Sequence, residues 1–378
     1  MLLWLGHPAS IVVLALLAAA CTGGGAPGAA RPETAGAASE SRAAPAAAPV
    51  QEAPTAAPVA AAPPLTTIKI AAQPSIPSAA RYIAIERGYL REEGIEQEEV
   101  PSDTSARMLP SLAAGQIDMG VGGVAAGLFN AIAQGIPVRI VLDMWTAYPG
   151  NEAGGIIVRK DLVDSGQVRD FRDLAGLRIA ITSKGQATEY GLHAGLSQGG
   201  LSLADVETLE MSYPDMTVAL GNRNVDAAVT IEPYGAQAVA QGFAARFKAW
   251  PALIPYDNPA TIMFSEAFAE TRNDVGRRFA KAYVRGLRDY DQARTKGKDR
   301  EEIIAIIQKH VPFLDRAIYD VMPWPSNNPD GRVNVETLGA AQDWFFERGY
   351  VQTKIDLAKA IDNQFVDYAL AQLGPYQP

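Results

Sequence analysis

The sequence predicts an α/β protein with two lobes, each built around a mostly parallel β-sheet flanked by helices. Between residues 67 and 145, strand-like apolar runs alternate with helix-like stretches across linkers of a few residues, which is the pattern of a parallel sheet with helices on its faces. Residues 159–254 repeat this alternation and indicate a second lobe. With 378 residues and 48% hydrophobic content, the chain is long enough to form two hydrophobic cores.

The first lobe begins with an apolar run at residues 68–72, which predicts a strand, and continues into a loop with two prolines at residues 73–78. Ser78 is the expected N-cap of the helix that follows, and Gly88 is its expected end. The remaining elements expected in this lobe are strands at residues 96–100, 118–121 and 138–142, and helices at residues 104–114 and 124–134.

The second lobe and the C-terminal part are expected to continue the same pattern. The strands expected in the second lobe are residues 179–181, 207–211 and 226–231, with helices at residues 187–196 and 217–220. Residues 260–264 form a further predicted strand. The C-terminal part is expected to be helical at residues 275–295, 301–309, 335–348 and 354–370, with prolines between helices.

Composition and missing motifs narrow the function. The formal net charge of −9 argues against nucleic-acid binding, which uses basic faces. The sequence has no His-x-x-x-His or paired-cysteine spacing for a metal, no Gly-x-Ser-x-Gly elbow and no Walker loop. Residues 120–123 contain three glycines but lack the rest of a phosphate-binding motif, so they are interpreted as a tight turn. We therefore expect a binding protein without a cofactor, and not an enzyme.

The N-terminus has the pattern of an exported, membrane-anchored protein. Residues 11–20 are an apolar stretch that is too short to span a bilayer, and residues 1–21 are interpreted as a lipoprotein signal peptide. Cys21, the single cysteine of the sequence, is the predicted site of lipidation; an ordinary signal peptide is the alternative, because no Lys or Arg precedes the apolar stretch. Residues 22–65 are rich in Ala, Pro and Gly and are expected to form a disordered tether.

Three segments together carry a family resemblance: IKIAAQPSIPSAARYIAIERGYLREEGI, LPSLAAGQIDMGVGGVAAGLFNAIAQGIPVRIV and DLAGLRIAITSKGQATEYGL. They resemble the solute-binding proteins of ABC importers for nitrate, sulfonates, taurine and thiamine-pyrimidine precursors, a superfamily that also includes thiamine-pyrimidine synthases and riboflavin-binding lipoproteins. The resemblance spans roughly residues 68–290.

The resemblance implies a type II periplasmic-binding-protein fold with the ligand in a cleft between the lobes. It implies that residues 66–158 and 255–378 form lobe 1, that residues 159–254 form lobe 2, and that the strand at residues 260–264 lies beside residues 156–158. The implied partners are a small-molecule ligand and the permease and ATPase subunits of an importer. The implied location is the extracytoplasmic face of the cell membrane, with the lipid on Cys21 as the anchor.

The ligand is expected where loops follow the carboxyl ends of the strands. The loop of residues 183–188 is the strongest candidate, because it offers hydroxyls, an amide and the free N–H groups of a helix N-terminus. Its alternative role is only to cap its own helix. The candidate ligand-binding residues are Ser75, Tyr82, Thr104, Gly123, Trp145, Tyr148, Ser183, Lys184, Gln186, Thr188, Tyr190, Tyr213, Glu232 and Tyr234.

The aromatic residues in this set favour a flat heterocycle as the ligand. Together with them, the resemblance to the riboflavin-binding lipoproteins implies riboflavin first and a thiamine-pyrimidine precursor second. Glu232 is expected to lie in the cleft, where it would suit a ligand with hydrogen-bond donors and disfavour a small anion. Binding of a sulfonate, nitrate or taurine remains an alternative. An enzyme similar to the thiamine-pyrimidine synthases is the alternative from another class, although the histidine- and cysteine-rich segments that such enzymes need are missing.

Overall fold

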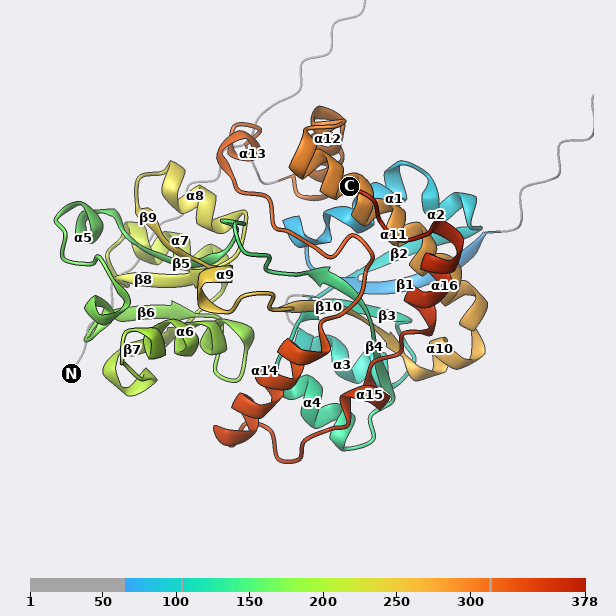
Figure 1. Cartoon of the computed structure of the whole chain (residues 1–378), viewed down its shortest axis with the longest axis horizontal. Helices are drawn as coiled ribbons and strands as arrows, with labels where there is room; N and C mark the ends of the chain where they lie inside the picture. The colour runs from blue at the N-terminus through green and yellow to red at the C-terminus, as the bar shows by residue number, and fades with distance from the viewer. Residues whose placement is uncertain (1–64, 103–104, 313–314) are drawn as a thin grey trace, which may run out of the picture. The chain divides into compact units, whose positions relative to one another are not determined.

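The computed structural model of the chain describes residues 65–102, 105–312 and 315–378. The predicted signal peptide, Cys21, nearly all of the predicted tether and Thr104 lie outside these residues. Within them, the chain forms two five-stranded sheets with helices around each (Figure 1). The two-lobed α/β organisation predicted from the sequence is therefore confirmed.

The first sheet has the strand order β2-β1-β3-β10-β4. β1 is parallel to both β2 and β3, whereas β10 runs antiparallel between β3 and β4. Because β10 opposes both neighbours, β3 and β4 still point the same way, and their carboxyl ends lie at one edge of the sheet. The bounds are β1 Thr66–Ala72, β2 Ile95–Pro101, β3 Met119–Gly123, β4 Val138–Trp145 and β10 Ala260–Ser265.

The second sheet has the corresponding order β7-β6-β8-β5-β9. Here β5 is the antiparallel strand, and it lies between β8 and β9. The bounds are β5 Gly155–Arg159, β6 Arg178–Ile181, β7 Glu207–Glu210, β8 Ala227–Thr230 and β9 Ala244–Ala249.

The expected pairing of residues 156–158 with the strand at residues 260–264 is wrong. Ile156, Ile157 and Val158 pair with β8 and β9 of the second sheet, and every residue of β10 pairs with β4. The chain therefore crosses between the sheets before β5, at residues 146–154, and returns at residues 250–259. Both strands are short apolar segments, and such a composition does not identify the sheet that a strand joins.

Helices cover both sheets and bury their apolar faces against them. The long helix α11 packs on α1 and on α16 (Gln364–Leu373), and its Gly286 lies directly against the backbone of Ala80. The principal helices are α1 Ala79–Glu86, α2 Tyr89–Glu92, α3 Ser105–Ala113, α4 Ala126–Ala133, α5 Lys160–Asp164, α6 Ala187–Gln198, α7 Tyr213–Gly221, α8 Tyr234–Ala240, α9 Trp250–Leu253, α10 Glu266–Thr271, α11 Asn273–Lys296, α12 Arg300–His310, α13 Ile318–Val321 and α14 Val335–Glu347.

Two details of the predicted helices are wrong. Residues 354–370 do not form one helix: α15 (Leu357–Ala360) and α16 (Gln364–Leu373) are separated at Ile361, whose backbone bridges to Ile140 of β4. The side chain of Ser78 does not cap α1; its Oγ lies 3.2 Å from Oγ of Ser75. Among the described residues, none of the helices combines the length and apolar character needed to cross a membrane.

Candidate ligand-binding site

A cavity lies where the loops at the carboxyl ends of strands from both sheets meet. Its walls come from the β1–α1 loop, the end of β3, the end of β4, the β6–α6 loop, the start of α7 and the start of α9. The lining residues are Gln73, Ser75, Pro77, Ser102, Val121, Gly122, Gly123, Met144, Trp145, Thr182, Ser183, Gln186, Ala187, Thr188, Tyr213, Ile231, Trp250, Pro259 and Ala260.

The β6–α6 loop forms one polar wall. Thr188 Oγ1 accepts a hydrogen bond from the backbone N–H of Thr182 over 3.0 Å and lies 2.7 Å from Thr182 Oγ1. These contacts hold the loop against the first turn of α6. They are made with Thr182 and not with an N–H group of the helix, which has no side-chain cap at Gln186, and Thr188 also lines the cavity. The side chains of Ser183 and Gln186 make no hydrogen bond of this kind in the described structure and line the cavity.

The loop after β1 forms the opposite polar wall. Ser75 lines the cavity, and its backbone N–H donates to the hydroxyl of Tyr82 over 3.3 Å. The ring of Tyr82 is fully buried and stacks on His310 with 4.4 Å between the ring centroids. Burial raises the pKa of Tyr82. Tyr82 therefore fixes the loop that carries Ser75 and is not itself part of the cavity wall.

Three aromatic rings contribute to the apolar surface of the cavity: Trp145 at the end of β4, Trp250 at the start of α9 and Tyr213 at the start of α7. The two indoles meet with 5.4 Å between ring centroids and an interplanar angle of 54°. Tyr213 stacks on Tyr234 at 5.7 Å, so Tyr234 supports the cavity ring from behind. Trp145 is only 3% exposed and Trp250 is fully buried, so the two indoles border the cavity with little free surface, whereas Tyr213 is partly buried.

Sequence reasoning missed Trp250, because it follows β9, a strand that was not predicted. The signal was available: Trp250 directly precedes a proline, after a stretch with alternating side chains at residues 244–249. Pro at the second position of a short helix is a usual start signal. A strand predicted at residues 244–249 would have placed Trp250 at a strand end.

The structure does not bring six of the predicted residues to the cavity wall. Tyr148 contacts Tyr256 edge to face at 6.0 Å, and burial raises the pKa of Tyr148 to about 12. Tyr190 packs on Trp344 at 5.3 Å. Of the full predicted set, those absent from the lining of this cavity are Tyr82, Tyr148, Lys184, Tyr190, Glu232 and Tyr234, while Thr104 lies outside the described residues.

The expectation that Glu232 offers a carboxylate to the ligand is wrong. Glu232 is fully buried, its Oε1 lies 2.6 Å from Nη1 of Arg246, and its Oε2 accepts from the backbone N–H of Ala236 over 2.9 Å. A carboxylate at the end of a strand can turn either into a cleft or toward a neighbouring strand. The Glu232 carboxylate turns toward β9, because the guanidinium of Arg246 on that strand attracts it. The argument from Glu232 against an anionic ligand is therefore removed.

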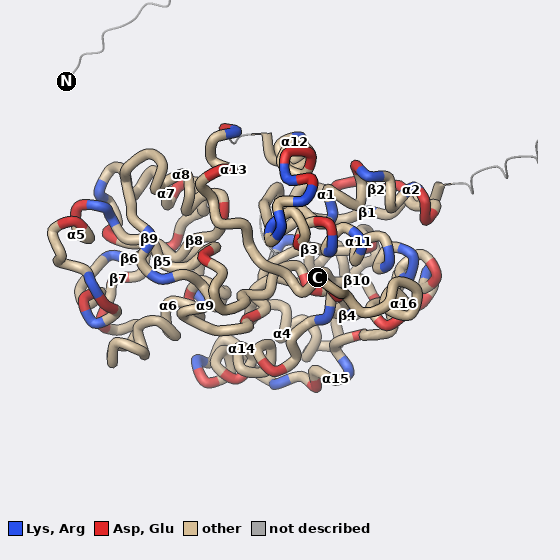
Figure 2. The backbone as a smooth tube through the Cα atoms, turned by 45° about the horizontal axis from the view of Figure 1, so that its top comes forward, with Lys and Arg blue, Asp and Glu red and all other residues tan. Residues whose placement is uncertain are grey.

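None of the lining residues that the structure describes carries a formal charge. Lys, Arg, Asp and Glu gather instead on outer elements such as α2, α5 and α12 (Figure 2). The polar groups available to a ligand are hydroxyls, side-chain amides and backbone N–H groups, which can bind a neutral solute or, at a helix N-terminus, an anionic group.

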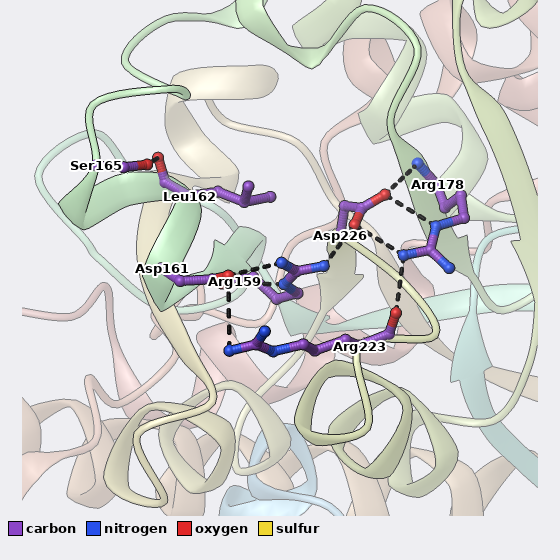
Figure 3. A network of polar contacts seen from close by, with 7 residues as sticks. All are labelled: Arg159, Asp161, Leu162, Ser165, Arg178, Arg223 and Asp226. Atoms are coloured by element: carbon purple, nitrogen blue, oxygen red, sulfur yellow. Dashed lines mark hydrogen bonds and ion pairs between the residues drawn. The ribbon is translucent and has the colours of Figure 1, made fainter.

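Charged residues of the second lobe form an ion-pair cluster around Asp226, away from the cavity. Asp226 lies between Arg159 and Arg178, with Nη1 of Arg159 at 2.8 Å and Nε of Arg178 at 3.0 Å, and Arg159 also binds Asp161 (Figure 3). Burial opposes ionisation of Asp226, yet the hydrogen bonds from Arg178 hold its pKa below the usual value. None of these side chains lines the cavity, and the cluster joins β5 and β6 to the residue that directly precedes β8.

Comparison with known proteins identifies the kind of fold. The chain is 24% identical over 320 residues to a protein of Bacillus subtilis (strain 168) named for binding aliphatic sulfonates, covering 82% of this chain and 89% of that protein. It is 25% identical over 323 residues to the riboflavin-binding protein RibY of Chloroflexus aurantiacus, covering 79% and 85%.

A solved structure agrees with these relatives. The alkanesulfonate-binding protein SsuA from Xanthomonas axonopodis pv. citri, bound to MOPS, superposes with a TM-score of 0.63 and 20% identity over 79% of this chain and 99% of that chain. The predicted two-lobed fold of periplasmic solute-binding proteins is thus confirmed. The NMT1/THI5-like family matches residues 76–292, which is more than half of the sequence, and the chain therefore belongs to this family.

Proposed function

We propose that this protein is the solute-binding component of an ABC importer, which captures a small organic solute in the cavity and delivers it to permease and ATPase subunits. The observation that carries the proposal is the composition of the cavity wall: loops of both lobes contribute to it, so a bound solute contacts both lobes at once. Contact with both lobes is what allows a ligand to favour a closed state. The solute-binding names of the relatives support the same role.

The solute we propose first is a neutral aromatic heterocycle, with riboflavin as the test ligand. Trp145, Trp250 and Tyr213 supply aromatic surface, and Ser183 and Gln186 supply uncharged donors and acceptors. Each stacked ring contributes on the order of 1–3 kcal/mol, by analogy with base stacking. A neutral ring system matches the described lining residues, none of which carries a formal charge. A thiamine-pyrimidine precursor would use the same features.

An organic sulfonate is the second candidate, and one observation favours it. The N-terminus of α6, a helix of 12 residues, contributes Ala187 and Thr188 to the cavity wall. Backbone N–H groups and the helix dipole stabilise anionic groups at such a position. With Glu232 paired to Arg246 away from the cavity, none of the described lining residues brings a carboxylate against an anion.

We propose binding without turnover. The lining residues offer aromatic rings, hydroxyls and amides, and none of these is a usual acid, base or thiol nucleophile without an activating neighbour. Incubation of the protein with pyridoxal phosphate, histidine and iron tests the enzymatic alternative from the thiamine-pyrimidine synthases. A pyrimidine product from this mixture would contradict the binding role.

A competition experiment decides between the two ligands. Flavin emission should be quenched when riboflavin stacks on Trp145, and the variant Trp145→Ala should bind roughly tenfold more weakly or worse, from the loss of one stacking ring. Phe346→Ala is the matched control, because Phe346 is an exposed ring that does not line the cavity. If MOPS or an alkanesulfonate binds while riboflavin neither quenches nor raises the melting temperature, the ligand is a sulfonate.

We also propose that residues 1–21 are a lipoprotein signal peptide, that Cys21 is acylated after its removal, and that residues 22–65 tether the binding domain at the extracytoplasmic face of the cell membrane. Mass spectrometry of protein extracted from membranes should find a mature chain that begins at Cys21 and carries acyl groups. An unmodified mature chain with another first residue would contradict the lipid anchor.

A further inference from the structure

Outside the cavity, the two lobes meet through a second set of contacts between α6 and the region around α14. Glu189, in the first turn of α6, is buried with 2% of its surface exposed. Its Oε2 accepts from the backbone N–H of Gly185 over 2.7 Å, and its Oε1 accepts from the hydroxyl of Tyr350 over 3.0 Å. One carboxylate thus joins the β6–α6 loop to a residue just beyond the end of α14.

Gly185 is the point at which this loop meets the first lobe. Its backbone C=O accepts from the N–H of Ala126 over 2.9 Å, and the neighbouring Gln186 forms a backbone bridge with Ala125. Gly185 has a φ of +71°, and a Cβ placed there would lie 3.5 Å from Cβ of Ala126 and 3.7 Å from Cγ of Tyr350. The positive φ favours glycine at this position.

Aromatic contacts extend the same junction along α6. Tyr190 and His193 both pack on Trp344 of α14, each with 5.3 Å between ring centroids. Tyr190 also lies 6.1 Å from Phe345. These rings bring lobe 2 against the C-terminal part of the chain, while Ser183, Gln186 and Thr188 of the adjacent loop line the cavity.

We propose that Glu189 is a positioning residue that couples the conformation of the cavity loop at residues 183–188 to the contact of lobe 2 with Tyr350. This inference rests on the proposed function, because it assigns a role in solute binding to residues that do not line the cavity. The two oxygens of Glu189 hold the loop and the C-terminal region at the same time. A solute that orders the loop therefore favours the contact with Tyr350, and the contact favours the binding conformation of the loop, as thermodynamic reciprocity requires.

Hydrogen exchange measured by mass spectrometry tests the coupling in the full-length chain without a ligand. The variant Tyr350→Phe removes one hydroxyl and leaves the ring in place. We expect exchange in residues 183–190 to become roughly tenfold faster, as for the loss of a hydrogen bond to a charged group. Tyr89→Phe is the matched control, because Tyr89 also donates to a carboxylate, that of Asp289, but within lobe 1 and away from the cavity loop.

The reciprocal arm uses riboflavin and MOPS as probes. In the unaltered protein, the probe that binds should slow exchange in residues 345–352, which contain no lining residue. In Glu189→Gln this distant protection should be lost. The double variant Glu189→Gln with Tyr350→Phe should lose much less probe affinity than the product of the two fold-losses measured for the single variants, because both residues belong to one interaction.

Three results would overturn the proposal: exchange in Tyr350→Phe that matches Tyr89→Phe, distant protection that survives in Glu189→Gln, or fully multiplicative affinity losses. Failure of both probes to bind would count against the proposed ligands alone, since the exchange measured without ligand still decides whether Tyr350 orders the loop.

Discussion

The indole Nε1 of Trp250 donates a hydrogen bond to Oδ2 of Asp257 over 2.9 Å. The ring of Trp250 lines the cavity, while Asp257 belongs to the segment that returns the chain from the second sheet to the first. The backbone C=O of Asp257 also accepts from Ala147, on the other crossing segment, over 2.8 Å. A cavity ring is thus linked through Asp257 to both connections between the lobes.

Removal of the Asp257 carboxylate should lower both stability and ligand affinity. In Asp257→Ala the buried indole N–H of Trp250 loses its acceptor, which costs about 1–3 kcal/mol in the free energy of unfolding. Asp257→Asn keeps an amide oxygen at this position and should lose less. Urea denaturation and ligand titration of both variants check the order, and equal effects of Asn and Ala would show that the hydrogen bond is unimportant.

Stability should fall with rising pH because of the buried Asp143. Its Oδ2 accepts from the backbone N–H of Asn328 and its Oδ1 from the side chains of Asn258 and Thr146, yet burial raises its pKa from 3.8 to about 7. A raised pKa means that the folded state binds the proton more tightly than the unfolded state. This contribution is therefore fully present below pH 3.8 and is lost as the pH rises toward 7.

Asp143→Asn removes this titration and serves as the reference. Between pH 4 and pH 7, the free energy of unfolding of the unaltered protein should decrease relative to the variant, by at most about 1.4 kcal/mol for each pH unit. Urea denaturation at several pH values measures the difference. A difference between the two proteins that stays constant over this range would contradict the assignment to Asp143.

Two helical glycines should respond differently to substitution by alanine, because Gly286 lies in the close contact of α11 with α1 and Gly127 of α4 has open space around it. A Cβ at Gly286 would lie 2.1 Å from the backbone oxygen of Ala80, a distance that the helices can relieve only by moving apart. Gly286→Ala should therefore destabilise the protein by about 1–3 kcal/mol or more, as overpacked sites do. Gly127→Ala, inside α4 with no atom within 4 Å, should be neutral or stabilise by up to about 1 kcal/mol. Thermal denaturation of both variants provides the test.

The sequence predicted local elements better than their pairing. The apolar runs behind β1, β3 and β4 alternate with helices, and this periodicity is a local property that a single sequence shows. The insertion of β10 between β3 and β4 depends on contacts between residues more than 100 positions apart, which no local pattern encodes. The same limit explains why β5 was assigned to the wrong sheet.

In the candidate site, too, the sequence predicted which loops reach the cavity better than it predicted where individual side chains point. Ser75, Ser183 and Gln186 reach the cavity because loops after strand ends meet there, a rule that follows from topology. Which way a side chain turns from such a loop depends on its neighbours in space. Tyr190 turns to Trp344 and Tyr82 to His310, and both partners come from the C-terminal helices, whose positions the sequence pattern does not give.

Glu232 was predicted to contact the ligand, whereas the structure gives it a buried ion pair and therefore a role in stability. Substitutions at this pair test the change of role. Its side chain is fully buried and has Arg246, on β9, as its ion-pair partner at 2.6 Å. Arg246→Met would leave a buried carboxylate without a cation and should cost about 3–5 kcal/mol in the free energy of unfolding. The double variant Glu232→Gln with Arg246→Met removes the charge as well, so it should recover much of that loss.

Urea denaturation of the single and double variants measures the coupling, and solute titration of the double variant should give nearly unchanged affinity. Equal stability of the single and double variants would show that the pair is unimportant, and a large loss of affinity in a stably folded double variant would return Glu232 to the ligand-binding site.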